Sequence, residues 1–193
     1  MFKVFLTLLF VFTTFSFAMT QAEIKSTMNN KIDKVILILK DSKISKEAKS
    51  SEIIKTMDSS FDYDLMSRLS LGHTWKDISS TQQEQFINLF TKRLKDSYVE
   101  KLDLYTDELV QILGTEQTKR NRITLNTQLI GKETKHDINY KFYKKKNEDH
   151  WLIYDVDLLG VSIIQTYRKQ FSGFLKEKSF DDLLSYLEKP KQK

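Results

Sequence analysis

The sequence predicts an α+β protein with N-terminal helices, a curved antiparallel sheet of about four strands, and C-terminal helices packed over the sheet around an apolar cavity. Two observations predict this fold. Apolar residues recur at helical spacing through the first half of the chain, and they alternate with a period of two in four segments of the second half. Runs of helices followed by runs of strands are typical of α+β domains. At 193 residues, one domain is expected.

The N-terminus has the features of a secretory signal peptide. Lys3 precedes an apolar run over residues 4–15, and Ser16-Phe17-Ala18 supplies small residues at a cleavage site. The run is too short to cross a bilayer, which takes about 20 apolar residues. We therefore expect a cleaved signal at residues 1–18 and a mature exported domain at residues 19–193. Cleavage after Ala22 is the weaker alternative. The chain has no cysteine, so neither a lipidated N-terminus nor a disulfide framework is expected.

Four helices are expected next. The first carries an apolar stripe of Ile24, Met28, Ile32, Val35, Ile36 and Leu39. A second helix is expected near residues 46–60. A short third helix begins after the cap residue Asp62 and ends at Gly72. A long fourth helix is expected to be capped by Ser80, with Gln83 completing a capping box. Its apolar face carries Phe86, Leu89, Phe90, Leu94, Tyr98, Leu102 and Tyr105.

The strands are expected at residues 109–116, 123–130, 135–144 and 151–158, joined by short polar turns. The last strand is apolar on both faces, so both need cover. Trp151 and Ile153 are expected on one face, and Leu152, Tyr154, Val156 and Leu158 on the other. After Gly160 the period becomes helical, which predicts a helix over residues 161–178. The stripe of that helix turns Val161 and Ile164 inward. A last helix over residues 180–187 is expected to be capped by Ser179.

Residues with catalytic or metal-binding chemistry are sparse. His73, His136 and His150 lie far apart, and Ser162 lacks the second glycine of a nucleophile elbow, so it is expected to cap a helix. Asp155 and Asp157 could bind a cation or act as acid and base, but accepting backbone N–H bonds at a helix start is the favoured role. We therefore expect no metal, no cofactor and no enzymatic activity.

The charge pattern gives no nucleic-acid interface. The net charge is +5, but the 31 cations are spread along the chain rather than gathered in a stripe. The basic turn at residues 144–146 is expected to be solvated, with an anionic membrane or a partner as the alternative. Large apolar side chains are abundant instead, with thirteen Phe, eight Tyr and two Trp. They fit either an ordinary aromatic core or an internal apolar cavity, and the pattern alone leaves both open.

Three motifs resemble a known family. The first is Phe61-Asp62-Tyr63 with residues 66–69, Leu71-Gly72 and Trp75, and the second is residues 83–86 with Phe90, Leu94, Tyr98, Leu102 and Tyr105. The third is Tyr154-Asp155-Val156 with Gly160-Val161-Ser162 and residues 167–171, and Leu183 and Leu187 fit the terminal helix. In this order they resemble the MlaC family of periplasmic phospholipid-binding proteins, a component of an ABC transport system linked to toluene tolerance. Ser179 in place of a glycine and Thr81 in place of a proline depart from the pattern at helix ends.

The resemblance implies a carrier that moves phospholipid between an outer-membrane lipoprotein complex and an inner-membrane ABC transporter, maintaining lipid asymmetry of the outer membrane. Such a carrier must enclose the acyl chains, since exposing two of them to water costs on the order of 20 kcal/mol. The residues expected to contact lipid are Phe90, Leu94, Tyr98, Leu125, Tyr140, Val156, Val161 and Ile164. A periplasmic accessory subunit that binds another protein in the same groove is the alternative. A small hydrolase is the third possibility, and it would need Asp155, Asp157 or Ser162 to meet a histidine in the cavity.

Overall fold

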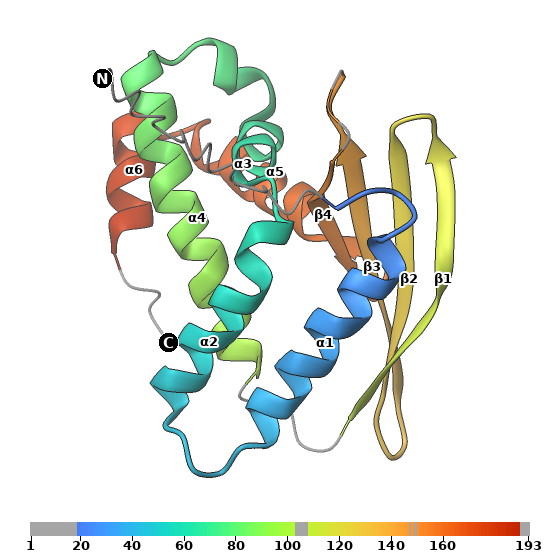
Figure 1. The fold of residues 1–193 in the computed structure, drawn as a ribbon. Coiled ribbons are helices and arrows are strands. Elements are labelled where there is room, and N and C mark those ends of the chain that lie inside the picture. The colour runs from blue at the N-terminus through green and yellow to red at the C-terminus, as the bar shows by residue number, and fades with distance from the viewer. Residues whose placement is uncertain (1–18, 103–107, 147, 149, 190–193) are drawn as a thin grey trace, which may run out of the picture.

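The computed structural model describes residues 19–102, 108–146, 148 and 150–189, with side chains described up to residue 97 in the first range. Its helices are α1 (Ile24–Lys40), α2 (Lys46–Met57), α3 (Tyr63–Leu71), α4 (Ser80–Leu102), α5 (Ile163–Phe174) and α6 (Phe180–Glu188). Short 3₁₀ turns occur at η1 (Asp58–Ser60) and η2 (Gly72–Lys76). The strands are β1 (Leu109–Lys119), β2 (Arg122–Ile130), β3 (Lys135–Lys144), β4 (Trp151–Leu158) and β5 (Val161–Ser162). The α+β prediction is confirmed (Figure 1). In the part of the chain described, no helix is long and apolar enough to cross a membrane.

The strands form one antiparallel sheet in chain order, β1-β2-β3-β4-β5. Other segments of the chain cover the outer edge of β4. Near its start, the Asp62 amide donates to the Ile153 carbonyl at 2.8 Å, and near its end β5 pairs with it through Leu158 and Val161. β1 forms the opposite edge and is bent by register shifts at Gly114 and near Lys119. The fifth strand has only two residues, which is why the sequence predicted about four.

A bulge in β4 changes which side chains share a face. Phe142 pairs with Ile153 and Lys141 pairs with Asp155, so Tyr154 is an extra residue in the ladder. Val156 and Leu158 therefore lie on the same face as Trp151 and Ile153, and all four pack into one apolar cluster. The prediction that they lie on opposite faces is wrong. A strict period of two cannot anticipate a residue that does not pair.

The apolar core of the described residues divides into two clusters. The first lies between α1 and the inner face of the sheet, which we define as the face that carries Trp151 and Ile153. The second joins α3, α4, α5 and α6. Phe61 and Ile163 pack against both clusters and so lie at the seam between them. Figure 1 shows α1 beside the sheet and α6 on the far side of α4.

Local capping fixes the helix ends as the sequence predicts in three cases. Asp62 accepts from the Leu65 amide at 2.9 Å, Ser162 accepts from the Gln165 amide at 3.0 Å, and Ser179 forms a capping box with Asp182. Gly72 ends α3 with a φ of +61°.

The predicted boundaries of α4 and α5 are wrong. The capping box of α4 uses Ser79 and Gln82, one residue earlier than predicted, with the Gln82 amide 3.2 Å from the Ser79 hydroxyl. The helix predicted over residues 161–178 begins only at Ile163 and ends at Phe174. Its start is later because Val161 and Ser162 pair with β4 as a short strand.

Candidate functional site

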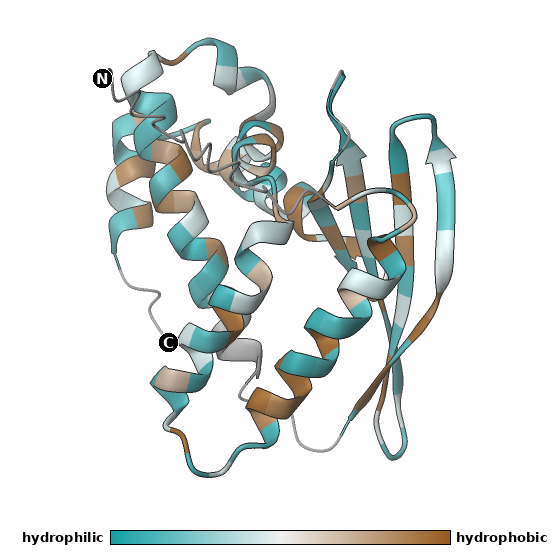
Figure 2. Ribbon diagram, in the orientation of Figure 1, coloured by the Kyte–Doolittle hydropathy of each residue, from teal (hydrophilic) through white to brown (hydrophobic). Residues whose placement is uncertain are grey.

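The last turns of α1 carry five consecutive apolar residues, Val35 to Leu39. A helix that packs on one side needs a single stripe, so an apolar run around the whole helix indicates contacts on more than one side. In the structure Leu37 is 69% exposed and its four apolar neighbours are half-buried. Figure 2 shows the same end of α1 as strongly hydrophobic.

Lysine contacts fix the position of this apolar helix end. The Lys49 ammonium of α2 donates to the Leu39 carbonyl at 2.6 Å, at the C-terminus of α1 where a cation is favourable. The Lys31 ammonium donates to the Thr56 carbonyl at 2.6 Å, and burial lowers the pKa of Lys31, helped by the nearby charge of Lys34. These two hydrogen bonds therefore join α1 to α2 at two positions along α1, Lys31 and Leu39.

The end of the sheet where β1 begins and β4 ends is also apolar and exposed. One row across the sheet pairs Ile112, Thr127, Ile138, Leu158 and Val161. Large exposed apolar side chains occur on α1, on β1 and at the turn from β4 to β5, and we call them together the apolar rim: Leu37 (69% exposed), Leu109 (60%), Leu113 (54%), Leu159 (64%) and Val161 (59%). Large apolar side chains this exposed are candidates for binding.

The turn from β4 to β5 presents part of this rim with unusual backbone geometry. Leu159 has a φ of +54° and Gly160 a φ of +77°, as a two-residue hairpin turn requires. Glycine or asparagine is favoured at such positions, so a leucine there carries some strain. The Leu159 amide donates to the Asp137 carbonyl at 3.0 Å, which helps to fix the turn.

Tyr140 lies one row further into the sheet. It pairs with the buried residues Leu125 and Val156 on the inner face. Burial raises the pKa of its hydroxyl to about 12, although the side chain keeps some accessible surface. Tyr140 therefore lies on the inner face of the sheet, beside the buried residues of the first cluster.

The predicted lipid-contacting residues divide between the two clusters. Leu125, Tyr140 and Val156 pack in the first cluster, and Phe90, Leu94 and Ile164 are almost fully buried in the second. The side chain of Tyr98 lies outside the described residues. The structure therefore divides six of these side chains between two clusters rather than bringing them into one group.

The prediction that Val161 opens a helix and lies on its apolar stripe is wrong. Val161 pairs with Leu158 in β5 instead of opening α5, and its side chain is 59% exposed at the rim. Sequence reasoning also missed Leu37, Leu109, Leu113 and Leu159 as members of a surface. The available signal was the run at residues 35–39, which is too apolar for one stripe.

Asp155 holds the start of α5 against the sheet. One of its oxygens accepts from the Ser162 hydroxyl at 2.7 Å, and the other accepts from the Ile164 amide at 3.2 Å. The Lys141 ammonium lies 3.3 Å from Asp155 and 2.8 Å from Asp157. Burial alone would lower the pKa of Lys141, but the hydrogen bonds and charges of the two carboxylates outweigh it and raise that pKa.

The contacts of Asp155, Asp157 and Ser162 indicate a structural role for these residues rather than a catalytic one. Ser162 uses its hydroxyl oxygen to cap α5, and the cation that joins the carboxylates is a lysine. The pairing places Lys141, Asp155 and Asp157 on the face of the sheet opposite the inner one. Within the described ranges, no group of three or more His, Cys, Asp or Glu side chains could hold a metal ion.

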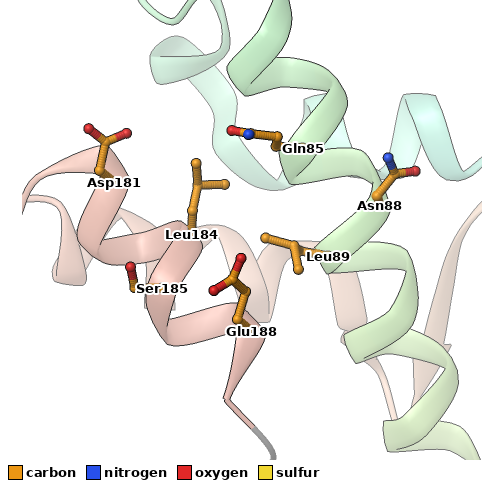
Figure 3. A pocket seen from close by; sticks show the side chains of 7 residues that line it. All are labelled: Gln85, Asn88, Leu89, Asp181, Leu184, Ser185 and Glu188. Carbon is orange, nitrogen blue, oxygen red and sulfur yellow. The ribbon is translucent and has the colours of Figure 1, made fainter.

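A separate pocket of about 420 Å³ lies between α4 and α6 (Figure 3). Its lining is Gln85, Asn88, Leu89, Asp181, Leu184, Ser185 and Glu188. Five of these seven side chains are polar and two of those are acidic, so the pocket does not suit acyl chains. It lies away from the apolar rim, on the opposite side of α4 from the sheet (Figure 1).

Comparisons with known proteins fit this arrangement. The model of the MlaC protein family matches residues 29–189. The intermembrane phospholipid transport system binding protein MlaC of Haemophilus influenzae is 25% identical over 121 residues, which cover 61% of this chain and 56% of that protein. The chain thus spans just over half the length of this curated relative. A phospholipid-binding protein from Ralstonia solanacearum, solved with a phospholipid, has the same fold: its TM-score is 0.71 at 17% identity, over 84% of this chain and 93% of the other.

Proposed function

The chain belongs to the MlaC protein family, and from this premise we propose that it is a periplasmic carrier of phospholipid. The carrier encloses the acyl chains between the inner face of the sheet and the helices. It shuttles lipid between the outer membrane and an inner-membrane ABC transporter, and so maintains the asymmetry of the outer membrane. It would act after removal of residues 1–18, as a single domain of residues 19–193, and without catalysis.

The apolar rim is the observation that carries this proposal. Five large apolar side chains exposed on α1, on β1 and at the turn from β4 to β5 are costly in water, at roughly 25 cal/mol for each Å² of apolar surface. Ile163 at the start of α5 packs against both clusters, and Tyr140 on the sheet packs against the first. Acyl chains that enter at the rim and separate the clusters would bury this surface. The charged headgroup would stay at the rim, in contact with water.

The names of the relatives support the same cargo. The Haemophilus protein is named as part of an intermembrane phospholipid transport system, and the Ralstonia protein was solved with its phospholipid. An intermembrane system implies donor and acceptor membrane complexes. We propose that the partners here are an outer-membrane lipoprotein complex and an inner-membrane ABC transporter complex.

Reloading of stripped protein tests the proposal. A ligand that binds only the folded state stabilises it by about 3 to 4 kcal/mol at 100 to 1,000 times its dissociation constant. We therefore expect the melting temperature to fall when lipid is removed and to recover when a diacyl phospholipid is added back, but not when glycerophosphocholine, which has no acyl chains, is added. Equal recovery with both compounds, or no change with either, would contradict the carrier function. It would favour the alternative, an accessory subunit that binds a protein through this surface.

A further inference from the structure

The end of the sheet opposite the apolar rim is strongly basic. The turn from β1 to β2 carries Lys119, Arg120 and Arg122, and the turn after β3 carries Lys144, Lys145 and Lys146. We call these six residues the basic end. The two turns are neighbours in space, because the Lys144 amide donates to the Asn121 carbonyl at 3.3 Å and Arg122 pairs with Tyr143. Basic residues that are 22 or more positions apart in the chain thus form one surface.

Among the described residues, two acidic side chains lie near these turns, and each has a partner of its own. The carboxylate of Glu148 lies 2.9 Å from the Nε2 atom of His150. Asp62 is buried, and its carboxylate is 3.8 Å from the Lys145 ammonium. Lys119, Arg120, Lys145 and Lys146 are exposed. The exposed lysines are compact charges on flexible stems, whose heads can move to meet an opposing anion.

Arg122 adds a fixed element to this surface. Its guanidinium stacks between two tyrosine rings, 4.0 Å from the ring centroid of Tyr143 and 4.8 Å from that of Tyr154. One of its nitrogens donates to the Asn121 carbonyl at 3.3 Å. Stacking reduces the conformational freedom that an arginine would lose on binding, and a guanidinium carries further donors suited to a phosphate group.

We propose that the basic end adsorbs to the surface of an anionic phospholipid bilayer. A scattered array of flexible cations matches a plane of mobile anionic headgroups, which can rearrange beneath it, better than the fixed charges of one protein partner. The exposed parts of the two turns are polar and basic, so they adsorb to the headgroups without inserting between acyl chains. Because β4 begins at the basic end and finishes at the rim, adsorption leaves the apolar rim accessible. The proposal goes beyond the carrier function and does not depend on the cargo.

Flotation with vesicles tests the proposal. We expect the protein to float with equimolar phosphatidylglycerol and phosphatidylcholine vesicles, and not with phosphatidylcholine alone. Binding should weaken steeply with salt, since the screening length falls from about 8 Å at 0.15 M to about 3 Å at 1 M. The combined variant Lys119→Gln, Arg120→Gln, Lys146→Gln should lose binding by on the order of 100-fold, given about fivefold for each cation at a membrane surface.

A charge-matched variant controls for net charge. Lys92→Gln, Lys169→Gln and Lys176→Gln remove three exposed cations from α4, α5 and the residues just after α5, and this variant should bind as the unchanged protein does. Equal loss in both triple variants would show a net-charge effect only and overturn the proposal. Absence of binding to anionic vesicles would also overturn the proposal, and it would favour an acidic protein surface as the partner. Lipid extracted from the same variants should be unchanged, which separates adsorption from cargo binding.

Discussion

The guanidinium of Arg168 in α5 lies directly against Gly72 at the end of α3. A Cβ atom added to Gly72 would come within 2.8 Å of the Nε atom of Arg168, and the glycine has a φ of +61° and a ψ of −120°. Two motifs that are 96 residues apart thus depend on each other. The glycine leaves the space that the arginine fills, and the contact joins α3 to α5.

We predict that Gly72→Ala destabilises the fold by about 1–3 kcal/mol, because a side chain disfavours this backbone conformation even if Arg168 moves away. Urea unfolding measures the change. Gly173→Ala is the matched control, since nothing lies within 4 Å of its added Cβ and it sits in α5. It should leave stability unchanged or raise it by up to about 1 kcal/mol. Equal effects of the two substitutions would show that the Gly72 geometry is not required.

Three helix caps were predictable from sequence because capping is local. Asp62, Ser162 and Ser179 each accept from an amide three residues ahead, and that spacing can be read directly in the chain. The bulge at Tyr154 was not predictable, because it depends on pairing with β3. It moves Val156 and Leu158 to the inner face and so changes which side chains can reach a ligand.

Tyr140 should make folding stability pH-dependent. Burial raises its pKa from 10.0 to about 12, so as the pH rises through this window the unfolded chain loses the proton before the folded chain does. The stabilising contribution is complete below pH 10 and is lost between pH 10 and about 12. Urea unfolding at about pH 8 and about pH 11 should show a larger alkaline loss for the wild-type protein than for Tyr140→Phe. Parallel losses in the two proteins would mean that the hydroxyl is fully solvated.

Val161→Glu tests the apolar rim. Because Val161 is 59% exposed, the new carboxylate can stay hydrated, and we expect stability within about 0.5 kcal/mol of the wild-type value. Bound phospholipid should nevertheless be largely lost, since acyl chains at the rim would have to displace that water. Circular dichroism and lipid extraction measure the two effects.

Val161→Ala and Gln165→Glu are the controls for this variant. The first removes apolar surface without adding charge, and the second adds the same charge on an exposed turn of α5. Both should keep their lipid. A folded Val161→Glu protein with full lipid content would exclude Val161 from the site, and an unfolded one would contradict the exposed position.

The start of the mature chain can be predicted from a packing contact. Met19 is buried in the first cluster, and its carbonyl accepts from the Trp151 amide at 2.8 Å. Cleavage after Ala22 would remove this contact, so we predict that the exported protein begins at Met19. Intact-mass measurement of periplasmic protein decides between the two sites. A mass that begins at Glu23, or one that retains residues 1–18, would refute the assignment.

The candidate site was only partly predictable, for a physical reason. Phe90, Leu94 and Ile164 are apolar residues at helical spacing, and such a pattern indicates burial without saying which cluster a residue joins. Leu113 and Leu159 are apolar residues at a bulge and a tight turn. Their exposure follows from strand register, which the sequence does not specify residue by residue.

The central claim, that the protein carries phospholipid, is tested most directly by organic extraction and mass spectrometry of protein purified from the periplasm without detergent. We predict diacyl phospholipid in a fixed molar ratio to the protein, and a marked reduction of that ratio in Val161→Glu relative to Gln165→Glu. An extract free of phospholipid from folded wild-type protein, or lipid present equally in both variants, would contradict the account.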